Sequence, residues 1–391
     1  MDSPRRILVI GAGIVGCSVA RELATDSTVV TVLERDDQAP RGSTAFAPGF
    51  VGVFNDVPVL TELARRSVEA YRSLGDEFTV SGGLELATTE HGVQLLEERV
   101  SSACAAGLSA VLHTAGELPD SVRSFVDSTR VTAVAEYLDD GVGVPSRLRA
   151  TMQAAAEQAG AHFRFGHEVV AIEPTAEAYD VVDNEGSRFP SDEVVLAAGV
   201  WGPSLAKLVG LDLPLFPVAH PYVYAQPGEP RVAAGPFVRW PEHHVYARAH
   251  ADQLGIGSYD HRPVSVPQNG LRDGAGLAWD DQFNAVIDEA QTLLRPEARF
   301  TPASRINGVF AMTPDNLPFL GRHPTMPQVW IAQALWITHA AGAAHILAQA
   351  IQHDIPIPPT LAVNRFAGSP SGSLAGSAMR LYRDIYASDP H

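Results

Sequence analysis

The residues that first suggest chemistry are three glycines near the N-terminus, at positions 11, 13 and 16. They follow a short apolar run and open a helical pattern, and the next apolar run ends in Glu34. In a strand–turn–helix unit, the first glycine permits a tight turn, the second lets the backbone approach a pyrophosphate, and the third lets the helix pack against the strand. The helix N-terminus offers amide donors to phosphates, and an acidic residue such as Glu34 accepts hydrogen bonds from ribose hydroxyls. This complete context favours a dinucleotide site over a merely structural turn.

Two further segments favour FAD over a nicotinamide dinucleotide. The apolar run Val194 to Ala198, closed by Gly199, lies far downstream, where the chain is expected to return beneath a cofactor too long for one strand–helix–strand unit. The segment Arg41 to Thr44 contains a glycine, follows Glu34 closely and could wrap the phosphates. For either segment alone, packing against the sheet is an equally good explanation.

A third group of motifs lies near the C-terminus. It comprises Asn307-Gly308, Thr313-Pro314-Asp315 and the segment Trp336 to Gly342, which opens a predicted helix. A helix N-terminus with small residues could hold the negative charge that a reduced flavin acquires. The simpler interpretation is a loop followed by a helix cap.

Hydrophobic periodicity predicts the elements that would position these groups. Strands are expected at 7–10, 29–33, 83–88, 168–172, 178–182, 193–198 and 329–334, and helices at 15–23, 60–74, 146–159, 279–294 and 340–351. Between 211 and 263, strands rich in Val, Tyr and His are broken by Pro and Gly, as in an antiparallel sheet. Beyond 351, proline and glycine indicate a loop-rich tail.

The expected fold class is therefore α/β, a Rossmann-type FAD-binding domain with an inserted antiparallel-sheet substrate domain. A chain of 391 residues is long enough for about two domains. We assign the FAD-binding domain to 1–80, 146–210 and 300–365, and the substrate domain to 81–145 and 211–299. Residues 366–391 form the C-terminal tail.

Composition excludes several classes of partner. The formal net charge is −17 without a basic stripe, which argues against nucleic acid. The two cysteines, Cys17 and Cys104, indicate neither a disulfide framework nor a metal site, and they fit a reducing compartment. No apolar run reaches the length of a signal-peptide core or a membrane span, so we expect a cytoplasmic protein without membrane contact. The oligomeric state stays open.

Taken together, the motifs resemble the FAD-dependent D-amino-acid oxidase superfamily. Within it, the chain is most similar to the flavin domain of dimethylglycine oxidases and dehydrogenases, with sarcosine and glycine oxidases as more distant relatives. The resemblance rests on the glycine fingerprint with Glu34 and on the segments 42–49, 220–222, 255–263, 307–308, 313–315 and 336–339, which follow in order along nearly the whole chain.

Departures from the pattern of this superfamily refine the expectation. Members of the subgroup that attach FAD covalently carry a histidine where this chain has Phe46, and monomeric sarcosine oxidases use a cysteine before Thr-Pro-Asp, whereas the last cysteine here is Cys104. The resemblance therefore implies non-covalent FAD. Glycine oxidases hold the substrate carboxylate with arginines where this chain has Phe310 and Ile337, which argues against free glycine.

The resemblance also implies roles for individual residues. His220 and Tyr246 match positions that face the substrate, so we expect them to be catalytic, although His220 could instead be a satisfied histidine of the sheet. Expected substrate contacts are Tyr222, Tyr259, Arg262 and Trp336, and Arg248 is a further possible partner for a carboxylate. Expected FAD contacts are Gly11, Gly13, Ile14, Val15, Gly16, Glu34, Arg35, Gly42, Ser43, Thr44, Phe46, Ala47, Val170, Ala198, Gly199, Trp201, Gly308, Pro314, Asp315, Trp336, Thr338 and His339.

The implied reaction is oxidation of the C–N bond of a small secondary or tertiary amine, or of an N-substituted amino acid, to an iminium that water hydrolyses. Oxygen or another electron acceptor would reoxidise the flavin. The dimethylglycine enzymes continue into a folate-binding domain, which is expected to be missing here because the sequence ends at His391. The alternatives are a flavin monooxygenase that uses NAD(P)H and a non-catalytic flavoprotein subunit of an assembly.

Overall fold

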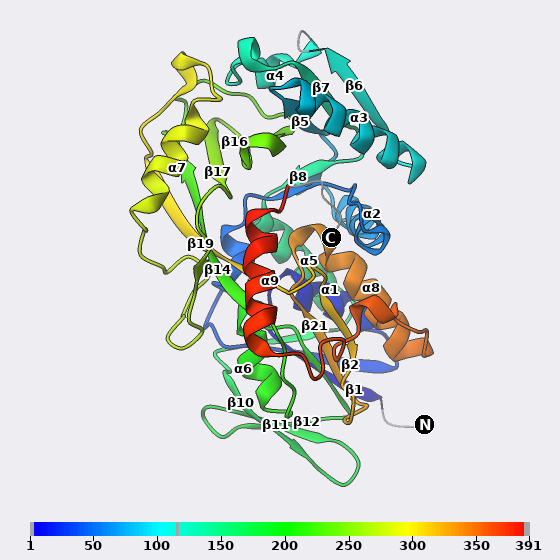
Figure 1. The fold of residues 1–391 in the computed structure, drawn as a ribbon. Helices are drawn as coiled ribbons and strands as arrows, with labels where there is room; N and C mark the ends of the chain where they lie inside the picture. Colours follow the sequence, from blue (N-terminus) through cyan, green and yellow to red (C-terminus); the bar gives the residue numbers. More distant parts are fainter. Residues whose placement is uncertain (1–3, 115–116, 387–391) are drawn as a thin grey trace.

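The computed structural model describes residues 4–114 and 117–386, and it has two main sheets joined by several crossings of the chain (Figure 1). The first three residues and the last five, which belong to the predicted FAD-binding domain and tail, lie outside the described residues. Within the described ranges, no helix combines the length and apolar character that a bilayer span requires.

The first sheet is the predicted dinucleotide-binding sheet. Its six strands run in the order β20 (Phe319–Arg322), β21 (Val329–Gln333), β13 (Glu193–Leu196), β1 (Arg5–Ile10), β2 (Thr28–Glu34) and β9 (His162–Phe165). All neighbours are parallel except β20 and β21. Because strands β9, β13 and β21 come from distant parts of the sequence, the chain leaves this sheet and returns to it several times, and such a return was predicted.

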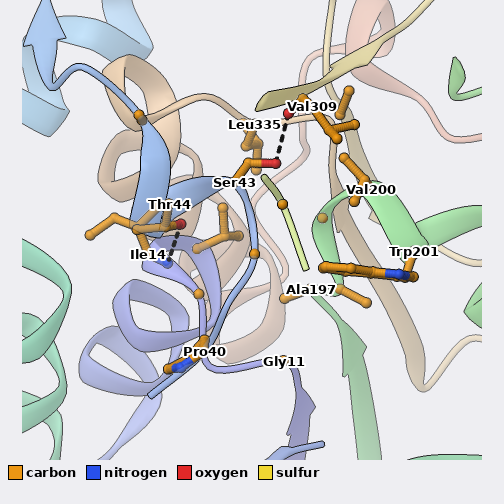
Figure 2. Close-up of a pocket in the computed structure, with 18 of the residues that line it drawn as sticks. Gly11, Ile14, Pro40, Ser43, Thr44, Ala197, Val200, Trp201, Val309 and Leu335 are labelled. Atoms are coloured by element: carbon orange, nitrogen blue, oxygen red, sulfur yellow. Dashed lines mark hydrogen bonds between the residues drawn. The ribbon is translucent and has the colours of Figure 1, made fainter. Parts of the chain in front are cut away.

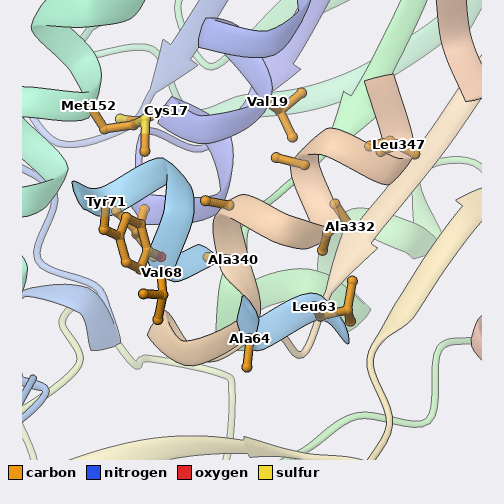
Figure 3. Close-up of a cluster of buried hydrophobic side chains, with 14 of the residues drawn as sticks. Cys17, Val19, Leu63, Ala64, Val68, Tyr71, Met152, Ala332, Ala340 and Leu347 are labelled. Carbon is orange, nitrogen blue, oxygen red and sulfur yellow. The ribbon is translucent and has the colours of Figure 1, made fainter. Parts of the chain in front are cut away.

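The two faces of this sheet enter different hydrophobic clusters, since successive side chains of a strand point to opposite sides. On β1, Ile7 and Val9 pack under helices α1 (Ile14–Leu23), α2 (Pro58–Arg72), α5 (Pro145–Gln158) and α8 (Ile337–His353), and Figure 3 shows side chains of this cluster. Leu8 and Ile10 face the other way, toward α6 (Gly202–Lys207) and the small antiparallel sheet of β10 (Val169–Pro174), β11 (Tyr179–Asp183) and β12 (Arg188–Ser191). The glycine turn after β1 is thus held between two packed layers.

The second sheet carries the aromatic residues of the predicted substrate domain. Its order is β18 (Val264–Ser265), β14 (Phe216–Tyr224), β17 (Gln253–Ser258), β16 (Val245–His250), β15 (Phe237–Trp240), β5 (Gly83–Ala87), β7 (Ala133–Tyr137) and β6 (Ala110–Thr114). The pairing is antiparallel except between β15 and β5. Strand β19 (Ser304–Met312), from a segment assigned to the FAD-binding domain, pairs with β14 along its full length.

Smaller elements complete the structure. Strands β3 (Phe50–Val51), β8 (Gly141–Gly143) and β4 (Phe78–Thr79) form a short antiparallel sheet. Helices α3 (Glu90–Ala105) and α4 (Asp120–Arg123) lie in the upper part of Figure 1 together with β5 to β7. Helix α7 (Gln282–Gln291) is shorter than the predicted 279–294 at both ends, and Trp279 precedes it and donates its indole N–H to Asn284 (2.9 Å).

The prediction of a loop-rich tail is wrong for its central part, where the structure has helix α9 (Ser371–Arg383). The segment contains Gly372 and Gly376, which disfavour an isolated helix. Ala378 and Tyr382, four residues apart, are buried on one face of the helix, against β14 and β19. Tertiary packing therefore outweighs a weak local propensity, and in Figure 1 α9 lies alongside these two strands.

Candidate active site

A single elongated cavity of about 580 Å³ contains most of the predicted site residues. One end is bordered by the glycine turn after β1 and by Glu34, and the other by aromatic side chains of the second sheet. In Figure 2, Thr44 lies on one side of the cavity and Trp201 and Val309 lie on the other, with Gly11 below them. The predicted cofactor contacts that line the cavity are Gly11, Gly13, Ile14, Val15, Glu34, Arg35, Gly42, Ser43, Thr44, Phe46, Ala47, Val170, Ala198, Gly199, Trp201, Gly308, Trp336 and Thr338.

The three fingerprint glycines differ in what surrounds them. Gly11 has φ of +106°, and a Cβ there would lie 2.6 Å from the carbonyl oxygen of Ala197. A Cβ on Gly16 would lie within van der Waals radius of the Gly11 carbonyl, so this glycine serves close packing of helix on strand. Gly13 has only the Thr44 hydroxyl near its absent Cβ, at 3.6 Å. The space in front of Gly13 therefore belongs to the cavity and not to the protein core.

Two helices begin at the cavity. Helix α1 starts after Gly13, and helix α8 starts after Trp336, which supplies no capping side chain. Ile337 and Thr338, the first residues of α8, line the cavity, as do the first residues of α1. Because the amides of a first helical turn lack partners within the helix, both ends present positive dipole ends to a ligand. The arrangement suits an anionic, elongated cofactor.

Glu34 closes the end of the cavity beside the glycine turn. Its carboxylate accepts hydrogen bonds from the backbone N–H of Ala12 (2.8 Å) and of Asp36 (3.1 Å). Burial raises the pKa of Glu34, and the two N–H donors oppose that shift. Each carboxylate oxygen keeps a further lone pair, so the group can accept ribose hydroxyls without losing its backbone partners.

The predicted phosphate-wrapping loop lies across the cavity from strand β13. Thr44 accepts a hydrogen bond from the backbone N–H of Ile14 (3.3 Å), and Ser43 donates to the carbonyl of Val309 (2.8 Å), both drawn in Figure 2. The guanidinium of Arg35 lies 3.9 Å from the ring centroid of Trp201, across the cavity mouth. These contacts hold the loop 42–44 between the two sheets.

Four predicted cofactor contacts do not line the cavity: Gly16, Pro314, Asp315 and His339. Asp315 instead forms an ion pair with Arg365 (2.7 Å) and accepts from the backbone N–H of Leu317 (3.1 Å), which fixes the turn after β19. Burial lowers the pKa of His339 to about 4, and its ring lies beside that of Trp336.

The opposite end of the cavity is aromatic. His220 and Tyr222 come from β14 and Tyr246 from β16, and the intervening strand β17 has glycines at 255 and 257. A Cβ on Gly257 would clash with Tyr246 and with Tyr222 at 2.6–2.7 Å, so the glycines allow both rings to lie against the sheet. The aromatic lining of this end also includes Phe50, Tyr259, Phe310 and Trp336.

His220 is the polar centre of this aromatic group. Its Nε2 lies 2.6 Å from the Tyr246 hydroxyl and its Nδ1 lies 2.6 Å from the hydroxyl of Tyr382. Burial, followed by the charge of His261, lowers the pKa of His220 well below its usual value, and burial raises the pKa of Tyr246 well above 10. Both groups are therefore neutral near pH 7, and the imidazole has one nitrogen available as an acceptor.

Sequence reasoning missed Tyr382, because it expected no ordered element in the tail. His261, which also contacts Tyr382 (2.8 Å), was noted only within a motif. Arg262, predicted to contact substrate, is exposed and does not line the cavity. Across the described residues, no group of three or more His, Cys, Asp or Glu side chains is arranged to hold a metal ion.

The buried Arg248 is differently placed from Arg262. Its Nη1 donates to the backbone carbonyls of Pro48 (2.6 Å) and Gly49 (3.0 Å), two residues that line the cavity, and to that of Gly143 (2.8 Å). Its Nε is buried without a hydrogen-bond partner, and no carboxylate pairs with the guanidinium among residues 4–114 and 117–386. Arg248 itself does not line the cavity.

This fold and site define a dinucleotide-binding protein whose cavity has a second, aromatic end, and comparison with known proteins gives the family. The family profile described as "FAD dependent oxidoreductase" (DAO) matches residues 6–350. The chain belongs to this family, and its cofactor is FAD. The open space at Gly13, the two helix N-termini and Glu34 fit the phosphates and ribose of that cofactor.

Individual relatives are distant. Mitochondrial dimethylglycine dehydrogenase of Mus musculus is 26% identical over 374 residues, which is 89% of this chain and 42% of that protein. Glycine oxidase of Geobacillus kaustophilus is 25% identical over 344 residues, covering 83% and 86% of the two chains. The crystal structure of L-proline dehydrogenase from P. horikoshii superimposes with a TM-score of 0.81 at 22% identity over 94% of this chain and 98% of that one. The chain thus spans less than half the length of the dimethylglycine dehydrogenase, and the likeness to the crystal structure concerns the fold.

Proposed function

We propose that this chain oxidises the C–N bond of a small secondary or tertiary amine, or of an N-substituted amino acid, to an iminium that water then hydrolyses. When bound, FAD supplies the acceptor for the hydride that leaves the carbon next to nitrogen. The observation that carries the proposal is a buried, neutral His220 joined to Tyr246 at the end of a cavity whose other end fits a dinucleotide. The name of the dimethylglycine dehydrogenase supports the same class of substrate, whereas that of the glycine oxidase supports oxidation of an amino acid in general.

The residues of the aromatic end have distinct roles in this reaction. An amine must lose its ammonium proton before the adjacent carbon can release hydride, so a proton acceptor beside the nitrogen is needed. The lone pairs of the Tyr246 oxygen can accept an N–H of the substrate while its own proton points to His220 Nε2. The faces of Tyr222, Tyr259 and Trp336 can contact N-alkyl groups and stabilise a cationic nitrogen.

A carboxylate must be recognised only if the substrate is an N-substituted amino acid, because a simple amine has none. Of the two arginines suggested by the sequence, Arg248 is the one that is buried near the aromatic end, and its Nε has no hydrogen-bond partner among the described residues. A buried guanidinium without a carboxylate partner is costly unless a ligand neutralises it. Because Arg248 does not line the cavity, we assign it, rather than the exposed Arg262, as a buried positive charge behind the carbonyls of Pro48 and Gly49 that favours an N-substituted amino acid.

Three other features of the proposed enzyme stay predictions. These are non-covalent attachment of FAD, reoxidation by oxygen or by another acceptor, and a cytoplasmic location. The competing functions are an NAD(P)H-dependent flavin monooxygenase and a non-catalytic flavoprotein subunit.

Anaerobic mixing of the FAD-loaded protein with a panel of amines and N-alkyl amino acids tests the proposal. We expect sarcosine, dimethylglycine or a larger N-alkyl analogue to bleach the flavin absorbance. Bleaching by NAD(P)H alone would replace the proposal by the monooxygenase, and no bleaching by either reagent would favour the non-catalytic subunit.

A further inference from the structure

We propose that Tyr382, on the C-terminal helix α9, is a positioning residue for His220 and that Tyr246, His220, Tyr382 and His261 form a directed proton relay leading away from the cavity. The proposal rests on the amine oxidation proposed above. Helix α9, which carries Tyr382, lies beyond residue 350, where the match to the family profile ends.

The direction of the relay follows from its far end. His261 Nδ1 lies 3.0 Å from the backbone carbonyl oxygen of Arg262, which can only accept a hydrogen bond. Nδ1 therefore carries the proton, and the Nε2 of the neutral imidazole is an acceptor. The Tyr382 hydroxyl, 2.8 Å from this Nε2, donates to it.

Tyr382 then fixes the tautomer of His220. A hydroxyl has one proton, and that of Tyr382 is directed to His261, with the carbonyl of Ala219 a longer second acceptor at 3.1 Å. The Tyr382 oxygen must therefore accept from His220 Nδ1–H, 2.6 Å away. This leaves His220 Nε2 unprotonated, so Tyr246 donates to it at 2.6 Å. All four groups point the same way, from the cavity toward His261.

A proton can move along this chain without any change in electron count. The substrate ammonium N–H bond breaks as an O–H bond forms on Tyr246, and the original Tyr246 proton forms an N–H bond at His220 Nε2. The Nδ1–H bond of His220 breaks in favour of Tyr382, whose own proton forms an N–H bond at His261 Nε2. The net result is a neutral amine in the cavity and an imidazolium at His261.

The surroundings of the two histidines favour that end state. Within the described residues, the groups facing His220 are the hydroxyls of Tyr246 and Tyr382 and the rings of Tyr259, Phe310 and His261, and none is an anion. Burial lowers the pKa of His261, but the hydrogen bond to the Arg262 carbonyl and the charges of Asp260 and Asp280 oppose that shift. A positive charge is therefore stabilised better at His261 than at His220.

Replacing Tyr382 by Phe tests the relay, because it keeps the ring contacts of α9 with His220, Tyr259 and Phe310 and removes only the hydroxyl. At neutral pH we expect flavin reduction at saturating amine to slow by about 10- to 100-fold, with FAD content unchanged. Above the pKa of the free amine, the rate should recover toward wild type, because the substrate then arrives neutral.

Tyr386→Phe is the matched control. Tyr386 follows α9, its ring lies 5.3 Å from that of Tyr259, and its hydroxyl has no hydrogen-bond partner within the described chain. This variant should reduce its flavin at the wild-type rate. A Tyr382→Phe variant that is equally slow at every pH, or as fast as wild type at every pH, would overturn the relay while leaving amine oxidation in place.

A second measurement needs no turnover. Nitrogen-15 spectra of histidine-labelled protein, with His220 assigned by comparison with His220→Ala, should show the Nδ1–H tautomer in wild type and a shift toward Nε2–H in Tyr382→Phe. An Nε2–H tautomer of His220 in wild type would refute the relay independently of any substrate. A wild-type flavin that no amine bleaches would instead refute the proposed function, and the relay with it.

Discussion

The two ends of the cavity are lined by different kinds of chemical groups. The cofactor end consists of backbone and small residues, in which Gly11, Gly13 and Gly42 border the space and helix N-termini face it. The other end, where we propose catalysis and which we call the catalytic end, consists of ring side chains, and a hydrogen bond joins its His220 to Tyr382 across 162 residues of sequence. Binding of a large anionic cofactor needs close backbone approach, whereas proton transfer needs fixed donors and acceptors. Mutation should therefore separate loss of the cofactor from loss of amine oxidation.

The largest effect is expected at Gly13. Replacement by Val should abolish FAD binding, because the side chain would fill the space that the pyrophosphate needs. The backbone of Gly13 is extended, with φ of −67°, and its built Cβ meets only Thr44, at 3.6 Å, so the apoprotein should still fold. Flavin content and circular dichroism of the purified variant measure the two quantities separately.

Gly16→Val is the contrasting control for that experiment. Its Cβ would overlap the carbonyl oxygen of Gly11, so we expect loss of the fold together with loss of FAD. Full flavin occupancy in Gly13→Val would show that the cofactor does not need the space in front of Gly13. Equal unfolding of both variants would mean that the space at Gly13 belongs to the protein and not to the cofactor.

The way in which FAD is attached should give a second all-or-none result. Phe46 lines the cavity and has no nucleophilic atom, so acid precipitation should release all FAD into the supernatant. Absorbance of the supernatant and of the resolubilised pellet measures the partition. Flavin retained in the pellet would show that another residue bonds the ring.

The difference between the two ends also explains what could be predicted from the sequence. The spacing of Gly11, Gly13 and Gly16 and the position of Glu34 are local, so the cofactor turn and the order of β1, α1 and β2 could be predicted from the residues alone. Pro314 and Asp315 were assigned to the cofactor by motif, and the structure shows the latter paired with Arg365 outside the cavity.

The catalytic end depends on long-range pairing that no local pattern specifies. His220 and Tyr246 meet because β14 and β16 flank β17, a register that is visible only once the sheet is formed. Tyr382 was missed because Gly372 and Gly376 argue against a helix, and only packing on β14 and β19 overrides them.

His220→Ala tests the catalytic end without touching the cofactor end. Flavin reduction should slow by about one to three orders of magnitude, the range expected for loss of a proton-transfer or positioning group. FAD content should not change, because His220 lies outside the glycine turn. Anaerobic stopped-flow absorbance measures the rate, with His113→Ala, at the far edge of the second sheet, as a control that should react normally. A normal rate in His220→Ala would remove this residue from the site.

The smallest effect is expected at Arg248, and it separates substrate recognition from chemistry within the catalytic end. Arg248→Gln should weaken binding of sarcosine by about 1–2 kcal/mol, or roughly 5- to 30-fold, the scale of a charge that acts across several ångströms of protein without a direct hydrogen bond. Binding of N-methylethylamine, which has no carboxylate, should change much less, and Arg262→Gln should affect neither because that side chain is exposed. Titration of the flavin reduction rate against concentration gives both dissociation constants. Because Arg248 also donates to the carbonyls of Pro48 and Gly49, an equal loss for both substrates would identify it as a loop anchor only. A carboxylate-selective loss would place the counter-charge on the second sheet, beyond Tyr246 on the same face of β16.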